Sequence, residues 1–279
     1  MKDYTSFQVG GVADCLVFPQ GLEELTRLVD FIGDRNLPYL VIGRGTNLLV
    51  RDGGVRGLVI SLSRGFREIE VKDEEIMVGA GTPLSRLLKL AQTQGLTGLE
   101  DLAGIPGTVG GALTMNAGAG STQLGELVDS LRWIGTSGEV VQIKKEGLNF
   151  SYRDLELPRG TIILGATLRL DKGDREGIRS RTVKNLLTKK KTQPLDQLSA
   201  GCIFRNPPER FAGKLIEEAG LKGVRVRGAK ISELHANFIV NTGEARARDI
   251  LILIDLIKEK VSQKTGISLV PEVKVIGED

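Results

Sequence analysis

Hydrophobic positions fall into two patterns along this chain. Short apolar runs, several of them bounded by glycine or proline, predict β-strands at residues 15–18, 39–42, 58–62, 76–78 and 162–164. Apolar residues recur at helical spacing between them, which predicts an amphipathic helix that carries Leu22, Leu25, Leu28, Val29 and Ile32 on one side.

A second helix is predicted after Thr82 and Pro83, which have the sequence pattern of an N-cap followed by proline in the first turn, and Gly95 should close it. A third is expected at about residues 174–191, ending before Pro194 because proline cannot continue a helix. Its apolar side should carry Ile178, Leu186 and Leu187, and its other side many cations.

The last long helix is predicted at about residues 245–264, with Gly266 as its C-cap. Its inward face should carry Ile250, Leu253, Ile254, Ile257 and Val261. The following residues, 267–276, have the composition of a strand.

These elements indicate a mixed α+β protein. A length of 279 residues suggests two or three domains, with a boundary near residue 193. Strands and helices do not alternate regularly, which argues against a doubly wound sheet. The turn Gly43-Arg-Gly45 also lacks the third glycine of a dinucleotide fingerprint, because Leu48 occupies that position.

Composition excludes several classes of protein. Basic and acidic residues nearly balance at 38 and 35, and aromatic residues make up only 4%, which argues against nucleic-acid binding. No signal peptide or membrane-spanning run is predicted, so we expect a cytosolic protein. Cys15, Cys202 and His235 are too few for a disulfide framework or a zinc site, so no metal is predicted, and Cys15 is expected in the core.

Glycine is concentrated in two segments that could bring backbone amides close to a ligand. One runs from residue 104 to 112 and continues to Gly118, and the other spans residues 43–47 after a predicted strand. Bare amides bind phosphate, so two such loops suit a pyrophosphate. The alternative is that these glycines serve only tight turns.

Seven segments together carry a family resemblance: residues 5–11, 43–49, 104–118, 151–153, 201–207, 235–241 and 271–273. In order and spacing they resemble the UDP-N-acetylenolpyruvoylglucosamine reductases, flavoenzymes of peptidoglycan synthesis. The resemblance covers about residues 3–277 and is to the shorter branch of the family, which lacks an extra tyrosine-bearing loop.

The resemblance implies an FAD-binding fold of the vanillyl-alcohol oxidase type, with two α+β subdomains around FAD and a smaller C-terminal α+β substrate-binding domain. The implied boundaries are 1–62 and 63–195 for the two FAD subdomains, with the tail 267–279 returning to the second, and 196–266 for the substrate domain.

The resemblance also implies which residues bind the cofactor. Those expected at the FAD pyrophosphate are Gly43, Arg44, Gly45, Thr46, Asn47, Gly104, Ile105, Pro106, Gly107, Thr108, Gly110, Gly111 and Ala112. Asn116 and Gly118 are expected near the flavin. NADPH as co-substrate is implied by the resemblance alone.

The family reduces an enol ether, which leaves carbanion character beside a carboxylate that must be stabilised and protonated. Arg153 suits a bidentate clamp on the carboxylate, and Glu272 can assist if it stays protonated. Most members have serine as proton donor, whereas this chain has Cys202. A thiol with an ordinary pKa of about 8.5 is a competent acid at neutral pH.

Structural roles remain open for these residues. Cys202 would then be a small buried residue with water as the proton source, Arg153 a surface cation paired with Asp154, and Glu272 an exposed charge. Tyr152, Asn206 and His235 are expected to bind the UDP-sugar substrate, although a lone histidine is as often structural.

Two other functions are compatible with these motifs: an FAD-dependent oxidase of an alcohol or sugar, and a non-catalytic flavin- or nucleotide-binding protein. An oxidase needs a base near its substrate rather than a carboxylate clamp and a proton donor, which favours the reductase. The sequence does not determine the oligomeric state, and we expect a monomer.

Overall fold

Two separate hydrophobic cores organise the chain. The computed structural model describes residues 1–279. Unit 1 comprises Met1–Asp14, Gly45–Arg56 and Lys189–Asp279, and unit 2 comprises Cys15–Arg44 and Gly57–Thr188. Each cluster of buried apolar side chains is drawn from one unit alone, so each unit has a core of its own.

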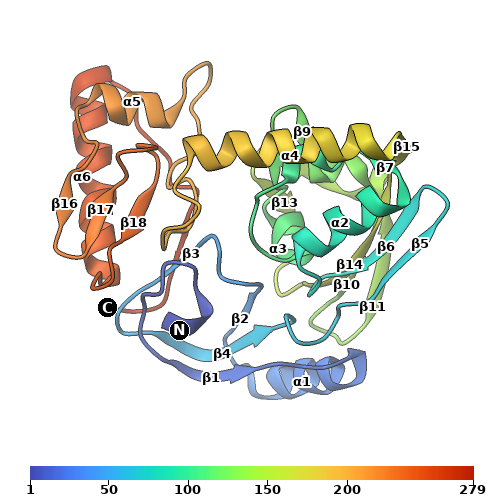
Figure 1. Ribbon diagram of the computed structural model, residues 1–279. Coiled ribbons are helices and arrows are strands. Elements are labelled where there is room, and N and C mark those ends of the chain that lie inside the picture. Colours follow the sequence, from blue (N-terminus) through green and yellow to red (C-terminus); the bar gives the residue numbers. More distant parts are fainter. The chain divides into compact units, whose positions relative to one another are not determined.

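Unit 2 is built on a five-stranded antiparallel sheet in the order β11-β10-β14-β6-β5 (Figure 1). Its strands are β5 (Ile69–Lys72), β6 (Glu75–Gly79), β10 (Val128–Ile134), β11 (Val140–Lys144) and β14 (Ile162–Arg169). The central strand β14 has buried residues on both faces, and α3 (Val109–Thr114) packs on it. A continuous apolar run is the sequence expected of such a strand.

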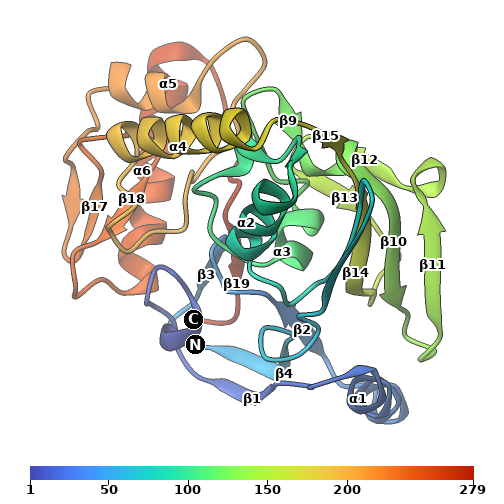
Figure 2. The same ribbon diagram turned by 45° about the vertical axis from the view of Figure 1, so that its right-hand side comes forward.

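Four helices belong wholly or mainly to unit 2: α1 (Leu22–Arg35), α2 (Leu84–Gln94), α3 (Val109–Thr114) and α4 (Arg175–Thr192), whose last residues fall in unit 1. In both views α2 and α3 lie side by side next to β14 (Figures 1 and 2). Helix α1 buries Leu25, Val29 and Ile32, which recur at helical spacing as the sequence predicts.

A second sheet has the order β1-β4-β2, formed by β1 (Ala13–Val17), β2 (Tyr39–Ile42) and β4 (Val55–Ser61). Strands β2 and β4 run parallel, with Tyr39 opposite Leu58 and Ile42 opposite Ser61. Strand β1 lies at the edge, and Cys15 on it is exposed. The prediction that Cys15 belongs to the core is therefore wrong: Asp14 and Cys15 point to opposite faces of β1 and both are exposed, so neither face of the strand is covered at this point.

Unit 2 also contains three two-stranded sheets. They are β7 (Leu96–Thr97) with β15 (Asp171–Lys172), β8 (Gly118–Ala119) with β9 (Thr122–Gln123), and β12 (Asn149–Ser151) with β13 (Asp154–Glu156). The short 3₁₀ helices of the chain are η1 (Lys2–Tyr4), η2 (Glu100–Leu102), η3 (Leu124–Leu127) and η4 (Lys145–Gly147).

Unit 1 packs helix α6 (Ala247–Thr265) against a three-stranded sheet in the order β16-β17-β18 (Figure 2). The other elements are α5 (Ala212–Glu218), which packs on α6, and β3 (Leu48–Val50), β16 (Arg225–Val226), β17 (Ala229–Ile231), β18 (Ile239–Asn241) and β19 (Lys274–Ile276). All five apolar residues predicted on the inward face of α6 are buried, and Gly266 caps it with φ +72°.

Several helix details differ from the prediction. Pro83, with ψ 132°, occupies the N-cap of α2, so the helix begins one residue later than expected and the buried Thr82 side chain does not cap it. Gly95 ends α2 with φ +72°, as predicted. On α4, Ile178 is buried, but Leu187 is 51% exposed, so the apolar side is narrower than the spacing suggested.

The C-terminal tail also differs. Only β19 is a strand within residues 267–276, because the preceding residues form irregular chain with one isolated bridge at Pro271. Strand β19 pairs in parallel with β3, a segment that the prediction assigned to the first FAD subdomain rather than the second. The division into three domains remains a prediction. The α+β fold class is confirmed, and no helix is both long and apolar enough to cross a bilayer.

Glu100 ties α4 to the start of η2. Its side chain is 9% exposed and accepts hydrogen bonds from Thr97 Oγ1, the Gly98 amide and Arg181 Nη2, each at 2.7 Å. Burial by itself raises the pKa of Glu100, but these hydrogen bonds outweigh it and hold the pKa below its ordinary value of 4.5. The carboxylate is therefore charged and stabilises the fold near neutral pH.

Replacing Glu100 with Gln should lower the free energy of unfolding at neutral pH by about 1–3 kcal/mol, because charged hydrogen bonds are lost. Since the folded-state pKa is lowered, this contribution is complete above the unfolded pKa of 4.5 and is lost as pH falls through the folded value. Urea unfolding of both proteins should show a difference that shrinks towards acid pH. The exposed Glu146→Gln serves as control, and a pH-independent difference would contradict the assignment.

Candidate active site

The loop after β2 presents backbone amides without backbone partners. The amides of Gly43, Arg44 and Gly45 donate to no backbone carbonyl. Gly43 packs so closely on Thr108 that a Cβ at residue 43 would overlap the Thr108 hydroxyl. Gly45 has φ +61°, a conformation that favours glycine. These observations fit the predicted role of the loop in holding an anionic group.

The second glycine loop is less open than the sequence suggested. The amides of Val109 and Gly110 donate to Thr82 O and Ala80 O, each at 2.9 Å. The Gly111 amide donates to the side chain of Thr108, which caps α3. The expectation of bare amides throughout 104–112 is therefore wrong for the first turn of α3, because the loop packs against the chain after β6.

The amides that do lack backbone partners in this loop belong to Gly104, Gly107 and Thr108. Gly104 and Gly107 have φ of +82° and +130°, so both positions need glycine. Gly110 serves packing instead, since a Cβ there would lie 2.9 Å from Ala80 Cβ. Both functions of glycine, open amides and close approach, are thus present in one loop.

A buried hydroxyl adds to the polar character of this region. Thr82 Oγ1 is buried and has no hydrogen-bond partner, and Pro83 forms a bridge with Thr108. An orphaned buried hydroxyl beside two stretches of free amides is chemistry that a bound diphosphate satisfies. The residues of unit 2 therefore fit the anionic part of a dinucleotide such as FAD. Sequence reasoning missed Thr82 because it read this residue as a helix cap.

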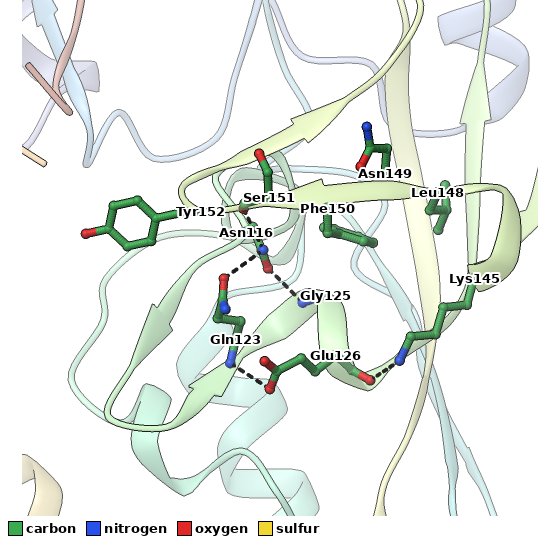
Figure 3. A pocket seen from close by; sticks show the side chains of 10 residues that line it. All are labelled: Asn116, Gln123, Gly125, Glu126, Lys145, Leu148, Asn149, Phe150, Ser151 and Tyr152. Atoms are coloured by element: carbon green, nitrogen blue, oxygen red, sulfur yellow. Dashed lines mark hydrogen bonds between the residues drawn. The ribbon is translucent and has the colours of Figure 1, made fainter. Parts of the chain in front are cut away.

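Asn116 and Gly118 follow α3, and Asn116 lines an open cavity of about 380 Å³ in unit 2 (Figure 3). Its walls come from Asn116, β9, η3, η4 and β12, and the ring of Tyr152 points away from Asn116. The Asn116 side chain is buried and bonded to three neighbours, Gln123, Gly125 and Ser151.

Arg153 is the second residue of the two-residue turn that joins β12 to β13. Ser151 pairs with Asp154 across this turn, and Arg153 has φ +60°, which is unusual for a residue with a side chain. Its guanidinium is half-buried and donates from Nη1 to Gly118 O at 3.0 Å. Strained backbone at a charged residue is typical of functional sites.

The segments that carry Cys202 and Glu272 lie side by side in unit 1, although the two residues are 70 positions apart in the sequence. The Glu272 amide donates to Ile203 O at 2.7 Å, the Arg205 amide donates to Val270 O at 2.9 Å, and Phe204 forms an antiparallel bridge with Pro271. Both side chains are half-buried. The structure thus places the candidate acid on the segment next to the candidate carboxyl, while Arg153 belongs to unit 2.

Two asparagines hold this pair of segments in place. Asn47 Nδ2 donates to Glu272 O at 3.2 Å, so part of its side chain is used within the protein. Asn237 brackets Phe204, donating to its carbonyl at 2.8 Å and accepting from its amide at 3.0 Å. Sequence reasoning missed Asn237. Its position in the segment 235–241, next to His235, was the available signal.

The candidate substrate residues have different surroundings. Tyr152 is 48% exposed. Asn206 is exposed, and its Oδ1 accepts from the Ala212 amide at 3.0 Å, at the start of α5. His235 is half-buried, packs edge-on against Phe238 and accepts from the Asn237 amide at Nδ1. Burial, aided by the positive charge of Lys222, lowers the pKa of His235, so the ring is neutral and Nε2 carries its proton.

The cations of α4 are mostly a solvated surface, as expected. Arg179 forms an ion pair with Glu176 on the same helix, and Arg181 forms one with Glu100. No group of three or more His, Cys, Asp or Glu side chains is placed to hold a metal ion.

Two family models match the chain. Residues 13–144 match an FAD-binding domain, and residues 193–276 match the C-terminal domain of UDP-N-acetylenolpyruvoylglucosamine reductase. The first match includes both glycine loops and Asn116, and the second includes Cys202 and Glu272.

Curated relatives carry the same name over the whole chain. The UDP-N-acetylenolpyruvoylglucosamine reductase of Geobacter metallireducens is 46% identical, covering 100% of this chain and 93% of the relative. That of Clostridioides difficile is 45% identical, covering 100% of this chain and 92% of the relative. The crystal structure of the reductase from Thermus caldophilus superposes with a TM-score of 0.85 at 40% identity, covering 98% of this chain and 96% of that one. By full-length similarity in sequence and in structure, the chain belongs to the UDP-N-acetylenolpyruvoylglucosamine reductase family.

Proposed function

We propose that this protein is an NADPH-dependent, FAD-containing reductase that converts UDP-N-acetylenolpyruvoylglucosamine into UDP-N-acetylmuramate for peptidoglycan synthesis. The relatives that match its full length are named for this activity. The observation that supports the proposal is the backbone pairing of the segment that carries Cys202 with the segment that carries Glu272, the residues proposed as proton donor and assisting carboxyl group. A protein that only binds flavin has no need of this arrangement.

FAD, when bound, supplies the hydride that it takes from NADPH. The amides of Gly43, Arg44, Gly104, Gly107 and Thr108 would hold its pyrophosphate, since they have no backbone partners. The task of the remaining residues is to bind the enolpyruvyl group, stabilise the negative charge that develops next to its carboxylate and deliver one proton.

Arg153 is proposed to bind the carboxylate of the enolpyruvyl group. Its guanidinium donates to Gly118 O from Nη1, and the planar fork of a guanidinium matches a carboxylate by two parallel hydrogen bonds. The backbone conformation of the turn, with φ +60° at Arg153, determines the direction in which the side chain leaves the backbone. Holding the carboxylate also stabilises the carbanion character that forms beside it.

Cys202 is proposed as the proton donor and Glu272 as the group that stabilises the developing charge. The thiol is half-buried rather than enclosed in the core, which a donor to a bound substrate requires. Only in its protonated form would Glu272 donate a hydrogen bond to the substrate carboxylate instead of repelling it. Asn47 and Asn237 fix the backbones that carry them.

Tyr152, Asn206 and His235 are proposed to contact the UDP-sugar. The neutral His235 offers an Nε2–H donor, which suits a phosphate or hydroxyl oxygen. We propose that the protein works in the cytosol, where NADPH and UDP-sugars are available, and that it acts as a monomer.

An anaerobic flavin titration tests the proposal. The purified protein should show the visible spectrum of bound FAD, lose it on addition of NADPH and regain it on addition of UDP-N-acetylenolpyruvoylglucosamine, with UDP-N-acetylmuramate formed. A flavin that stays reduced after the substrate is added would refute the reductase and favour a binding protein. Recovery of the spectrum only when oxygen is admitted would favour an oxidase.

Substitution Gly43→Ala should lower the FAD bound per protein at least several-fold. The new Cβ overlaps the Thr108 hydroxyl, so the loop or Thr108 must move from the position that aligns the free amides. The FAD content is read from the ratio of visible to ultraviolet absorbance. Gly21→Ala is the matched control, because no atom lies within 4 Å of a Cβ at that position. Full flavin content in Gly43→Ala would contradict the role of this loop.

Cys202→Ala should slow reoxidation of the flavin by substrate by about 10²-fold or more, because general-acid catalysis is lost. Cys202→Ser should keep most of the rate and lose the alkaline decline that the thiol causes near its ordinary pKa of about 8.5. Stopped-flow absorbance measures both. The role of Cys202 is wrong if the alanine variant turns over at the wild-type rate.

Alkylation of Cys202 should likewise block reoxidation. Because Cys15 is exposed and also reacts, iodoacetamide inactivation has to be measured in a Cys15→Ser background. In that background the Cys202→Ser protein should resist inactivation completely.

A further inference from the structure

The hairpin that carries Arg153 needs support from outside itself. Strands β12 and β13 pair only with each other, over three residues each. An isolated two-stranded hairpin is at best marginally stable in water. Phe150 and Leu155, which pair across the hairpin, pack on the core of unit 2, whereas Ser151 and Tyr152 at the turn are exposed. The position of Arg153 therefore depends on whatever holds the Ser151 end of the turn.

Asn116 provides that support from the segment after α3 (Figure 3). Its Nδ2 donates to Ser151 O at 2.8 Å and to Gln123 Oε1 at 3.0 Å, and its Oδ1 accepts from the Gly125 amide at 2.9 Å. One side chain thus connects β12, β9 and η3. A Cβ at Gly125 would lie 2.5 Å from the Phe150 ring and 2.9 Å from Asn116 Oδ1, so glycine at this position lets the three segments approach.

The orientation of this amide is determined by its partners. The Ser151 carbonyl can only accept and the Gly125 amide can only donate, so Nδ2 must face the first and Oδ1 the second. Both N–H groups are then used within the protein. The buried Asn116 side chain has no donor left for FAD or for a substrate.

The backbone of Asn116 has φ +37°, a conformation in which asparagine is more common than most residues. Two residues later, Gly118 O accepts from Arg153 Nη1 at 3.0 Å. The short segment from Asn116 to Gly118 therefore holds the hairpin twice, by the backbone before the turn and by the guanidinium itself.

We propose that Asn116 is a positioning residue for Arg153: its carboxamide fixes the Ser151–Arg153 turn so that the guanidinium is aligned for the carboxylate of the substrate. This rests on the proposed role of Arg153 as the carboxylate clamp. It replaces the expectation that Asn116 binds the cofactor, because the hydrogen bonds of its side chain are made within the protein.

Asn116→Asp is the sharpest test, since it changes almost nothing in shape and tolerates the same backbone conformation. The carboxylate keeps the bond to the Gly125 amide but faces the Ser151 carbonyl with an acceptor only, whereas the Gln123 amide can turn so that its Nε2 donates to the carboxylate. We expect unchanged FAD content and an unchanged rate of flavin reduction by NADPH. The substrate concentration for half-maximal reoxidation should rise roughly tenfold or more.

A pH series and a second variant separate positioning from general damage. As the new carboxyl is protonated at acid pH it regains one donor, so the defect of Asn116→Asp relative to wild type should shrink. Asn116→Gly keeps the backbone conformation and removes all three hydrogen bonds, and it should show the same defect at every pH.

Hydrogen exchange gives a readout that does not depend on activity. In both variants the amides of residues 151–154 should exchange faster than in wild type, while β14 stays protected. The control is Asn149→Ala, which removes an exposed amide on the same hairpin that bonds only to Glu156. It should leave the substrate dependence and the exchange of the turn unchanged.

The results that would refute the positioning role of Asn116 differ from those that would refute the proposed reductase activity. Loss of FAD, or slower reduction by NADPH, in Asn116→Asp would overturn the proposal and return Asn116 to the cofactor site. Wild-type reoxidation and exchange in both variants would overturn it as well. Failure of the proposed function would appear in the wild-type protein, as a reduced flavin that the enolpyruvyl substrate does not reoxidise.

Discussion

The close packing of the 107–112 loop on the chain after β6 is the constraint on which the rest of unit 2 depends. Two amides of α3 donate to Ala80 O and Thr82 O, and only a glycine at residue 110 allows the approach. This contact fixes where α3 begins. It thereby fixes Asn116 at its end, and through Asn116 the turn that carries Arg153.

Open amides and packed amides alternate along this loop. In the turn before α3 the amides of Gly104, Gly107 and Thr108 have no backbone partner, whereas the amides of the first helical turn donate to other groups of the protein. A loop with every amide bare would have nothing to hold it in place before a ligand arrives. The loop is thus fixed by one part while the other part keeps its amides open, which is the preorganisation that anion binding requires.

In unit 1, two segments that are distant in the sequence pair with each other. Neither the Cys202 segment nor the Glu272 segment forms a regular strand, yet three backbone hydrogen bonds join them around Ile203 and Phe204. Parallel pairing of β19 with β3 anchors one segment, and the Asn237 side chain anchors the other. A thiol and a carboxyl on such adjacent segments suit proton delivery to a charged intermediate.

Local pattern in the sequence determined much of this protein. The sequence predicted strands β1, β2, β4, β6 and β14, the four long helices and the left-handed caps at Gly95 and Gly266. It also showed the family motifs. Each of these features depends on periodicity or on residues close in sequence. Only the tertiary structure decided which amides stay open, why Cys15 is exposed on an edge strand, that β19 joins β3, and that Asn116 holds a hairpin. Each of these depends on partners brought from elsewhere in the chain, and the hydrogen-bonding demand of a buried polar group is met by whichever donor the fold brings near it.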